Sequence, residues 1–173
     1  MADMVPEFDQ ALSVLRADHG HIKHLLADLK TCNQVEQQKV LADLFLGLRI
    51  HSVVEQQVVF PSVCHSSLAS ERIADCGKDL YTMLSMMLAL ESSEDGEFVE
   101  MLTALAKKFE QHVCKDERIF SQLLSESQNK LCSLADKMTS VRIELEAKLA
   151  PRKVTREDYA SMILRNRRQS RCA

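Results

Sequence analysis

The chain has 173 residues and a formal net charge of −3, with 46% hydrophobic and 27% charged residues. This length excludes two large domains, and the hydrophobic share excludes a chain too polar to bury a core. Glycine and proline occur only 4 and 3 times, which argues against a β-rich fold with many tight turns and predicts an all-α protein.

Four segments show the three-and-four spacing of hydrophobic residues that is typical of amphipathic helices. They cover about residues 9–30, 35–60, 70–90 and 96–124. Short connections between them predict an up-down-up-down four-helix bundle. A fifth segment, about residues 127–149, keeps the same spacing with no polar residue in its hydrophobic stripe. It predicts a C-terminal helix that packs outside the bundle.

Polar side chains interrupt three of these stripes at a common level. His19 falls in the first stripe, His51 and Glu55 in the second, and His112 and Asp116 in the fourth. Each HxxxE/D pair places an imidazole and a carboxylate one turn apart on the same helix face. Because burying such groups without partners is costly, the pattern predicts a metal site. Imidazole and carboxylate together are ligands for iron, manganese or zinc.

Other polar residues near this level leave alternatives open. Glu117 could replace Asp116 as a ligand, and the spacing does not choose between them. His21 and His24 lie off the first stripe and are expected to face solvent. In the third stripe the corresponding position is Gly77. We expect this glycine to face the polar layer and to leave a void that water or a small molecule could enter.

The motifs Asp18-His19, His51-x-x-x-Glu55 and His112-x-x-x-Asp116-Glu117 resemble those of the hemerythrin-like family, also called the HHE cation-binding domain. The resemblance covers about residues 9–150. It implies a non-haem di-iron site used for reversible O₂ binding, for iron or oxygen sensing, or for peroxide and NO chemistry.

The chain departs from the family pattern in the third helix. Family members carry one or two histidines there, whereas residues 73–78 read Ile-Ala-Asp-Cys-Gly-Lys. We therefore expect an asymmetric or mononuclear site holding one or two non-haem iron ions or another divalent metal. Its second position would be weak, empty or completed by water, Cys76 or an incoming ligand. The expected metal ligands are His19, His51, Glu55, His112 and either Asp116 or Glu117.

Residues 151–173 differ from the rest of the chain in charge. They hold seven Lys/Arg against two Asp/Glu, a balance of +5 that leaves −8 on residues 1–150. We expect a hemerythrin-like bundle over residues 1–150 and a basic C-terminal tail over 151–173. The tail is expected to be a solvated terminus or a contact for an acidic protein partner.

Location and function class follow from what the sequence lacks. No hydrophobic run reaches the roughly 18 residues of a membrane span, no secretory signal is evident, and the six cysteines form no CxxC pair. We expect a cytoplasmic protein that binds O₂ or another small ligand, without a membrane or nucleic-acid partner. The alternative is a degenerate, metal-free scaffold that acts as an interaction module. The absence of ExxH and HExxH motifs argues against a ferritin-like oxidase or a zinc protease.

Overall fold

The computed structural model describes residues 7–63, 67–93, 95–126 and 133–149, and these residues are helical apart from short turns. The elements in chain order are α1 (Glu7–Asp28), α2 (Gln34–Val54), the π-helix η1 (Glu55–Val59), α3 (Phe60–Val63), α4 (Ser67–Glu91), α5 (Asp95–Glu126) and α6 (Leu134–Leu149). No strand occurs in the described ranges. The all-α prediction is confirmed.

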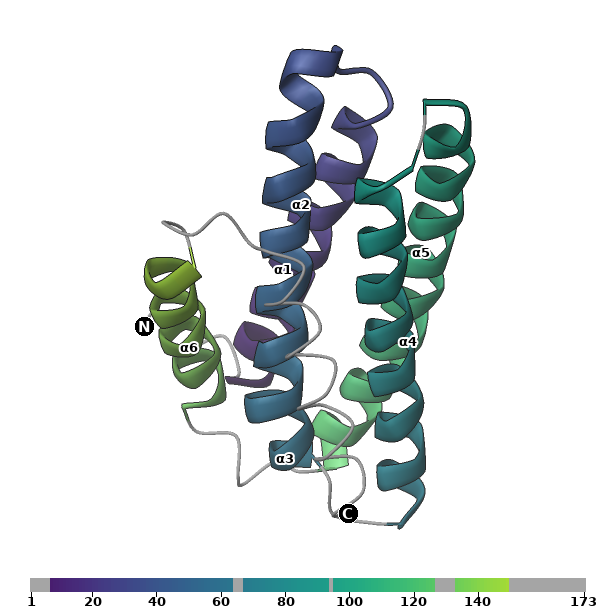
Figure 1. The fold of residues 1–173 in the computed structure, drawn as a ribbon. Coiled ribbons are helices and arrows are strands. Elements are labelled where there is room, and N and C mark those ends of the chain that lie inside the picture. Colours follow the sequence, from purple (N-terminus) through teal and green to yellow (C-terminus); the bar gives the residue numbers. More distant parts are fainter. Residues whose placement is uncertain (1–6, 64–66, 94, 127–132, 150–173) are drawn as a thin grey trace.

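The bundle consists of four rods: α1, the continuous helix α2–η1–α3, α4 and α5. Contacts join α1 to α2, α2 to α4, α4 to α5, and α5 back to α1, so each rod packs against the two that flank it. Helix α6 lies outside this bundle against α1, α2 and η1, on the side away from α4 and α5 (Figure 1). The predicted up-down-up-down bundle with an extra C-terminal helix is therefore correct.

Local sequence explains where the second rod begins and where it changes form. Asn33 caps α2, because its side-chain oxygen accepts from the backbone N–H groups of Val35 and Glu36 at 3.0 Å. The rod widens at η1, where the Phe60 N–H donates to the Glu55 carbonyl five residues earlier. Pro61 follows directly and lacks the N–H that a regular helix would use. The spacing of the hydrophobic stripe did not predict this π-turn. The feature of the sequence that could have indicated it is Pro61.

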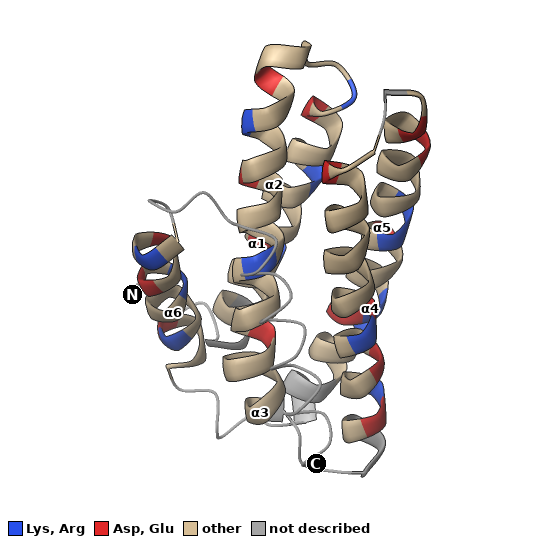
Figure 2. Ribbon diagram, viewed as in Figure 1, with Lys and Arg blue, Asp and Glu red and all other residues tan. Residues whose placement is uncertain are grey.

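The hydrophobic core consists mainly of residues from the predicted stripes. Fully buried residues include Leu15, Ile22, Leu44, Leu48, Leu80, Met83, Met87, Leu102, Leu105 and Phe109. Figure 2 shows Lys, Arg, Asp and Glu interspersed along the outer faces of α5 and α6. None of the described helices is long and apolar enough to cross a membrane.

Helix α4 buries Leu80, Leu84 and Met87 as expected, but at the level of the polar layer its buried residue is not the predicted one. Cys76 is the buried residue at the level of the polar layer, with 1% of its surface exposed, whereas Gly77 is only half-buried and Ile73 packs at the edge of the core. The prediction that Gly77 faces the layer is wrong for this reason. Asp79 is also buried and pairs with Lys108 at 2.5 Å and Lys115 at 2.9 Å on α5. These pairs fix which side of α4 turns toward α5.

Candidate metal centre

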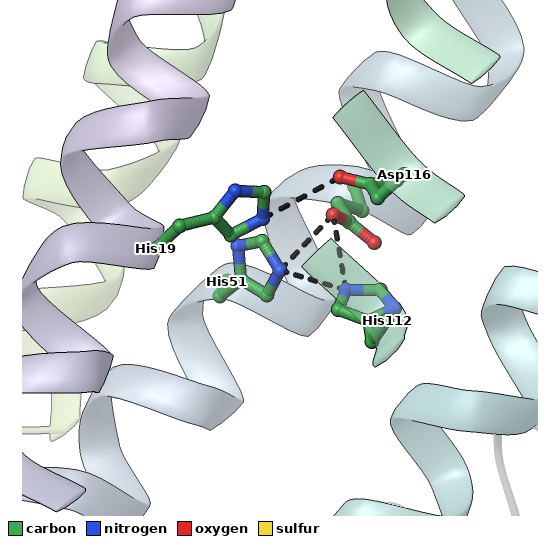
Figure 3. Close-up of side chains that lie close together, drawn as sticks. His19, His51, His112 and Asp116 are labelled. Carbon is green, nitrogen blue, oxygen red and sulfur yellow. Dashed lines mark hydrogen bonds and ion pairs between the residues drawn. The ribbon is translucent and has the colours of Figure 1, made fainter. Parts of the chain in front are cut away.

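Five polar side chains from three rods converge inside the bundle. They are His19, His51, Glu55, His112 and Asp116, each at most 2% exposed. One ligand atom from each lies within 4.8 Å of all the others. Figure 3 shows the three imidazoles and Asp116 pointing toward one another from their separate helices. The predicted polar layer therefore exists in three dimensions.

Each rod places its residues by simple helix geometry. Helix α1 supplies His19, and His51 lies in the last turn of α2 one turn before Glu55. Glu55 begins η1, so the widened turn starts at a residue of the cluster itself. On α5, His112 and Asp116 are one turn apart. π-turns within helices are frequently found at functional sites.

The shortest contacts join ring nitrogens to carboxylate oxygens and to one another. His51 Nε2 lies 3.0 Å from Glu55 Oε1 and 3.2 Å from His112 Nε2. His112 Nε2 lies 3.6 Å from Glu55 Oε1, and His19 Nε2 lies 3.5 Å from Asp116 Oδ2. All three imidazoles thus direct Nε2 toward the middle of the cluster (Figure 3).

Most of these inward-facing atoms have no properly aligned hydrogen bond. Both oxygens of Glu55, both oxygens of Asp116 and His19 Nε2 are buried without a hydrogen-bond partner. The short His51–Glu55 contact is therefore an ion pair rather than an aligned hydrogen bond. Buried polar atoms are ordinarily satisfied, so five orphaned atoms around one point need a common partner.

The spacing of the cluster fits one metal ion. Bonds from zinc to nitrogen or oxygen are about 2.0–2.2 Å long, so ligands at right angles lie about 3 Å apart and opposite ligands about 4.2 Å apart. The contacts of 3.0 to 3.6 Å and the 4.8 Å limit are slightly wider than these values. Three imidazoles and two carboxylates are also the donor types that iron, manganese and zinc accept.

The hemerythrin HHE cation-binding domain model matches residues 10–124, a segment that contains all five clustered residues. The chain belongs to the hemerythrin HHE cation-binding family. Comparisons with curated proteins and with solved structures gave no match. In this hemerythrin domain the matched segment ends within α5, so α6 lies beyond it.

The pKa values of the clustered side chains shift in different directions. Burial first, and then the neighbouring His51, lower the pKa of His19 to about 4. Burial opposes protonation of His51, but the Glu55 and Asp18 carboxylates together outweigh it and raise the pKa of His51. Burial likewise opposes ionisation of Glu55, yet His51 and His112 hold the pKa of Glu55 well below its usual range. The metal-free site therefore favours a charged His51–Glu55 pair beside a neutral His19.

The two neighbouring acids on α5 take different positions in this hemerythrin domain. Asp116 is fully buried, and burial together with the Glu55 charge raises the pKa of Asp116 well above its usual range. Glu117 is 27% exposed and lies outside the cluster, where Glu117 Oε1 contacts His19 Nδ1 at 3.1 Å. Its other oxygen accepts from Arg16 at 3.0 Å. The structure thus brings Asp116 into the layer and leaves Glu117 behind His19.

Aromatic side chains cover both ends of the cluster. The Phe109 ring lies 6.0 to 6.4 Å from the ring centres of all three clustered histidines and is 0% exposed. About one turn beyond the two acids, Phe60 stacks on Phe120 with a centre separation of 5.9 Å. The site is therefore enclosed by hydrocarbon, which strengthens every electrostatic interaction inside it.

Among the residues whose side chains the structure describes, helix α4 adds none to the cluster. Its buried Cys76 has a pKa raised by burial, and by the charges of Asp116 and Glu55, which keeps the thiol protonated. Cys76 is not among the residues whose ligand atoms converge. On this side of the layer, the buried α4 residue is thus a small neutral side chain rather than a histidine.

The remaining predicted residues lie away from the cluster. His21 and His24 are exposed, as expected, and His24 pairs with Asp28 on its own helix. Residues 151–173 fall outside the described ranges. Sequence reasoning gave no role to Arg16, or to Arg142, which pairs with Asp18 across 124 positions. Such a long separation leaves no local pattern to detect.

Proposed function

We propose that this hemerythrin-family protein binds one non-haem iron ion through His19, His51, Glu55, His112 and Asp116 and uses it to bind O₂ or a similarly small ligand, or to report iron or oxygen availability. The observation that supports this most directly is the set of buried, unpartnered oxygen and nitrogen atoms facing one point. Neutral imidazoles with two ionised carboxylates give a charge of −2, which balances a divalent cation.

Stability alone does not account for a cluster of this kind. Buried ionic groups can often be replaced by hydrophobic residues of similar volume with no loss of stability, or with a gain. Here five such groups lie together at 0 to 2% exposure in an otherwise hydrophobic core. A cation supplies the favourable interaction that protein partners do not provide.

The lack of a ligand from helix α4 favours one bound metal ion rather than two. Two-metal sites place the ions about 3.5–4 Å apart and need ligands for both. All converging atoms among the described residues lie within 4.8 Å, and none comes from α4. The protonated Cys76 is a poor ligand, because metals bind the thiolate. We therefore propose a mononuclear site that receives no ligand from α4.

The chain's own residues define what the site can do. Bound iron would supply a redox-active centre to which small ligands can coordinate. The three imidazoles and two acids would hold it, and Phe109 excludes water from one end. The enclosed geometry favours the binding or sensing of a small ligand.

Metal analysis together with an optical spectrum tests the proposal. Protein purified without chelator and reconstituted with Fe²⁺ under anaerobic conditions should hold close to one equivalent, and His51→Ala should hold far less. His24→Ala is the matched control, because His24 is 75% exposed and outside the cluster. Two tightly held irons with an oxo-bridge absorption band would contradict the mononuclear site.

The departure at α4 favours a second candidate, a metal-free scaffold. Without a metal, the His51–Glu55 ion pair and the Glu117–His19 contact satisfy part of the cluster. On this alternative, wild type and His51→Ala would both bind no metal. The same measurement therefore distinguishes the two functions.

A further inference from the structure

The two ring nitrogens of His51 face different surroundings. Its Nε2 atom points into the cluster, and its Nδ1 atom faces Asp18 Oδ2 at 4.0 Å. Both His51 Nδ1 and Asp18 Oδ2 are buried and have no hydrogen-bond partner. An imidazole that binds metal through one nitrogen carries its proton on the other. The group that accepts a hydrogen bond from this second N–H fixes the orientation of the ring. Asp18 is placed to be that group.

Asp18 is itself held from outside the bundle. It is 3% exposed, and its Oδ1 atom accepts from the guanidinium of Arg142 on α6. The same guanidinium reaches Glu146, one turn further along α6, at 3.4 Å. One oxygen of Asp18 therefore binds Arg142 while the other faces His51.

Helix α6 brings Arg142 to this position through hydrophobic contacts of its own. Leu134 and Met138 are buried at 3% and 1% exposure, and α6 packs against α1, α2 and η1. Arg142 follows Met138 by one turn and so lies on the same helix face. This helix is not part of the segment that the family model matches.

A second histidine of the cluster, His19, also has a carboxylate next to its outward-facing ring nitrogen, and an arginine binds that carboxylate. His19 Nδ1 lies 3.1 Å from Glu117, which accepts from Arg16 at 3.0 Å. His112 differs, because its Nδ1 atom is buried without a partner. Two of the three imidazoles are thus backed by a carboxylate that an arginine holds.

We propose that α6 positions His51 through Arg142 and Asp18, so that metal affinity depends on a helix outside the matched domain. Arg142 is a positioning residue in this proposal, since it contacts neither the metal ligands nor the metal position. The metal-affinity part rests on the proposed function. Loss of a group that orients a metal ligand typically weakens metal affinity 10–100-fold.

Co²⁺ is a suitable probe because its visible spectrum reports ligand geometry. Arg142→Met keeps most of the side-chain volume and should weaken Co²⁺ binding about 10–100-fold, measured by chelator competition, and shift the visible bands. Arg142→Lys keeps a cation and should restore much of the affinity. Glu146→Gln removes the other partner of Arg142 and should change neither quantity. Equal affinity and spectrum for wild type and Arg142→Met would overturn the proposal, as would an equal effect of Glu146→Gln.

A measurement on the metal-free protein separates this proposal from the proposed function. The ¹⁵N chemical shifts of the His51 ring should change in Arg142→Met and stay unchanged in Glu146→Gln, because only the first variant frees Asp18. If wild type binds no Co²⁺, the proposed function fails, and the ¹⁵N shifts alone decide the role of Arg142. Identical His51 shifts in wild type and Arg142→Met would then overturn it.

Discussion

The Nε2 atoms of His51 and His112 lie 3.2 Å apart in the centre of the bundle, although α2 and α5 are not packed side by side. Their imidazoles reach across the core between two diagonal rods. His19 closes the gap from α1, whereas α4 on the opposite side contributes no ligand. A metal bound here would link three of the four rods, and its ligands would hold diagonal helices together.

Metal binding should therefore stabilise the whole fold. A ligand that binds only the folded state adds about 2.7 kcal/mol at a free concentration 100 times its Kd. Thermal unfolding with added Fe²⁺ or Co²⁺ should show a Tm that rises with metal concentration and returns to the metal-free value with chelator. His24→Ala should behave as wild type. A Tm unchanged at metal concentrations far above the measured Kd would contradict a site formed only in the folded bundle.

Asp116 and Glu117 should differ in their effect on metal binding. Asp116→Asn removes the negative charge and replaces one carboxylate oxygen with an amide NH₂, so it should reduce affinity by more than the roughly 100-fold expected for loss of an outer group. Glu117→Gln removes only the group behind His19 and should cost about 10–100-fold. Titration with Co²⁺ in competition with a chelator measures both. The reverse order would show that Glu117 is the ligand and that its side chain moves inward on binding.

The metal-free protein should become more stable when Asp116 is replaced by asparagine. Burial and the Glu55 charge raise the pKa of Asp116, so the folded protein retains a proton that the unfolded chain releases above about pH 3.9. The stability linked to this proton is present below pH 4 and is lost as the pH rises. Urea unfolding in chelator should show Asp116→Asn gaining over wild type between pH 4 and 8. A constant difference across that range would contradict the raised pKa.

His19 should give the opposite pH dependence. Its folded pKa is about 4, whereas the unfolded chain binds a proton near pH 6.5. The free energy of unfolding of the wild type should therefore decrease by about 3 kcal/mol as the pH drops from 6.5 to 4, which means that the folded protein becomes less stable. His19→Gln has no such proton to bind, so the difference between the two proteins in chelator should shrink over this range. A difference that grows toward low pH would contradict a neutral buried His19.

Phe109 should affect both the fold and the site. Phe109→Leu leaves space beside all three imidazoles and should reduce the free energy of unfolding by about 1–3 kcal/mol. Phe45→Leu is a matched control, because Phe45 is also buried but lies almost two turns before His51. Both variants should lower stability, and only Phe109→Leu should change the Co²⁺ spectrum. If the spectrum changed in both variants, a general loss of core packing, rather than the contact of Phe109 with the imidazoles, would explain the change.

Much of the site was visible in the sequence, because helix periodicity links position to direction. His19, His51, Glu55, His112 and Asp116 interrupt hydrophobic stripes, and a residue in a stripe must face the core. The same rule located the long helices to within a few residues. It could not choose between Asp116 and Glu117, since adjacent positions differ by only about 100° around a helix.

Tertiary packing decided the rest. On α4, Cys76 and Asp79 are buried, and Asp79 pairs with Lys108 and Lys115 on α5. The Arg142–Asp18 pair joins residues 124 positions apart. Periodicity within one segment thus determined which residues could face the core. The partners they meet there depend on how separate helices are rotated and docked, which no single segment encodes.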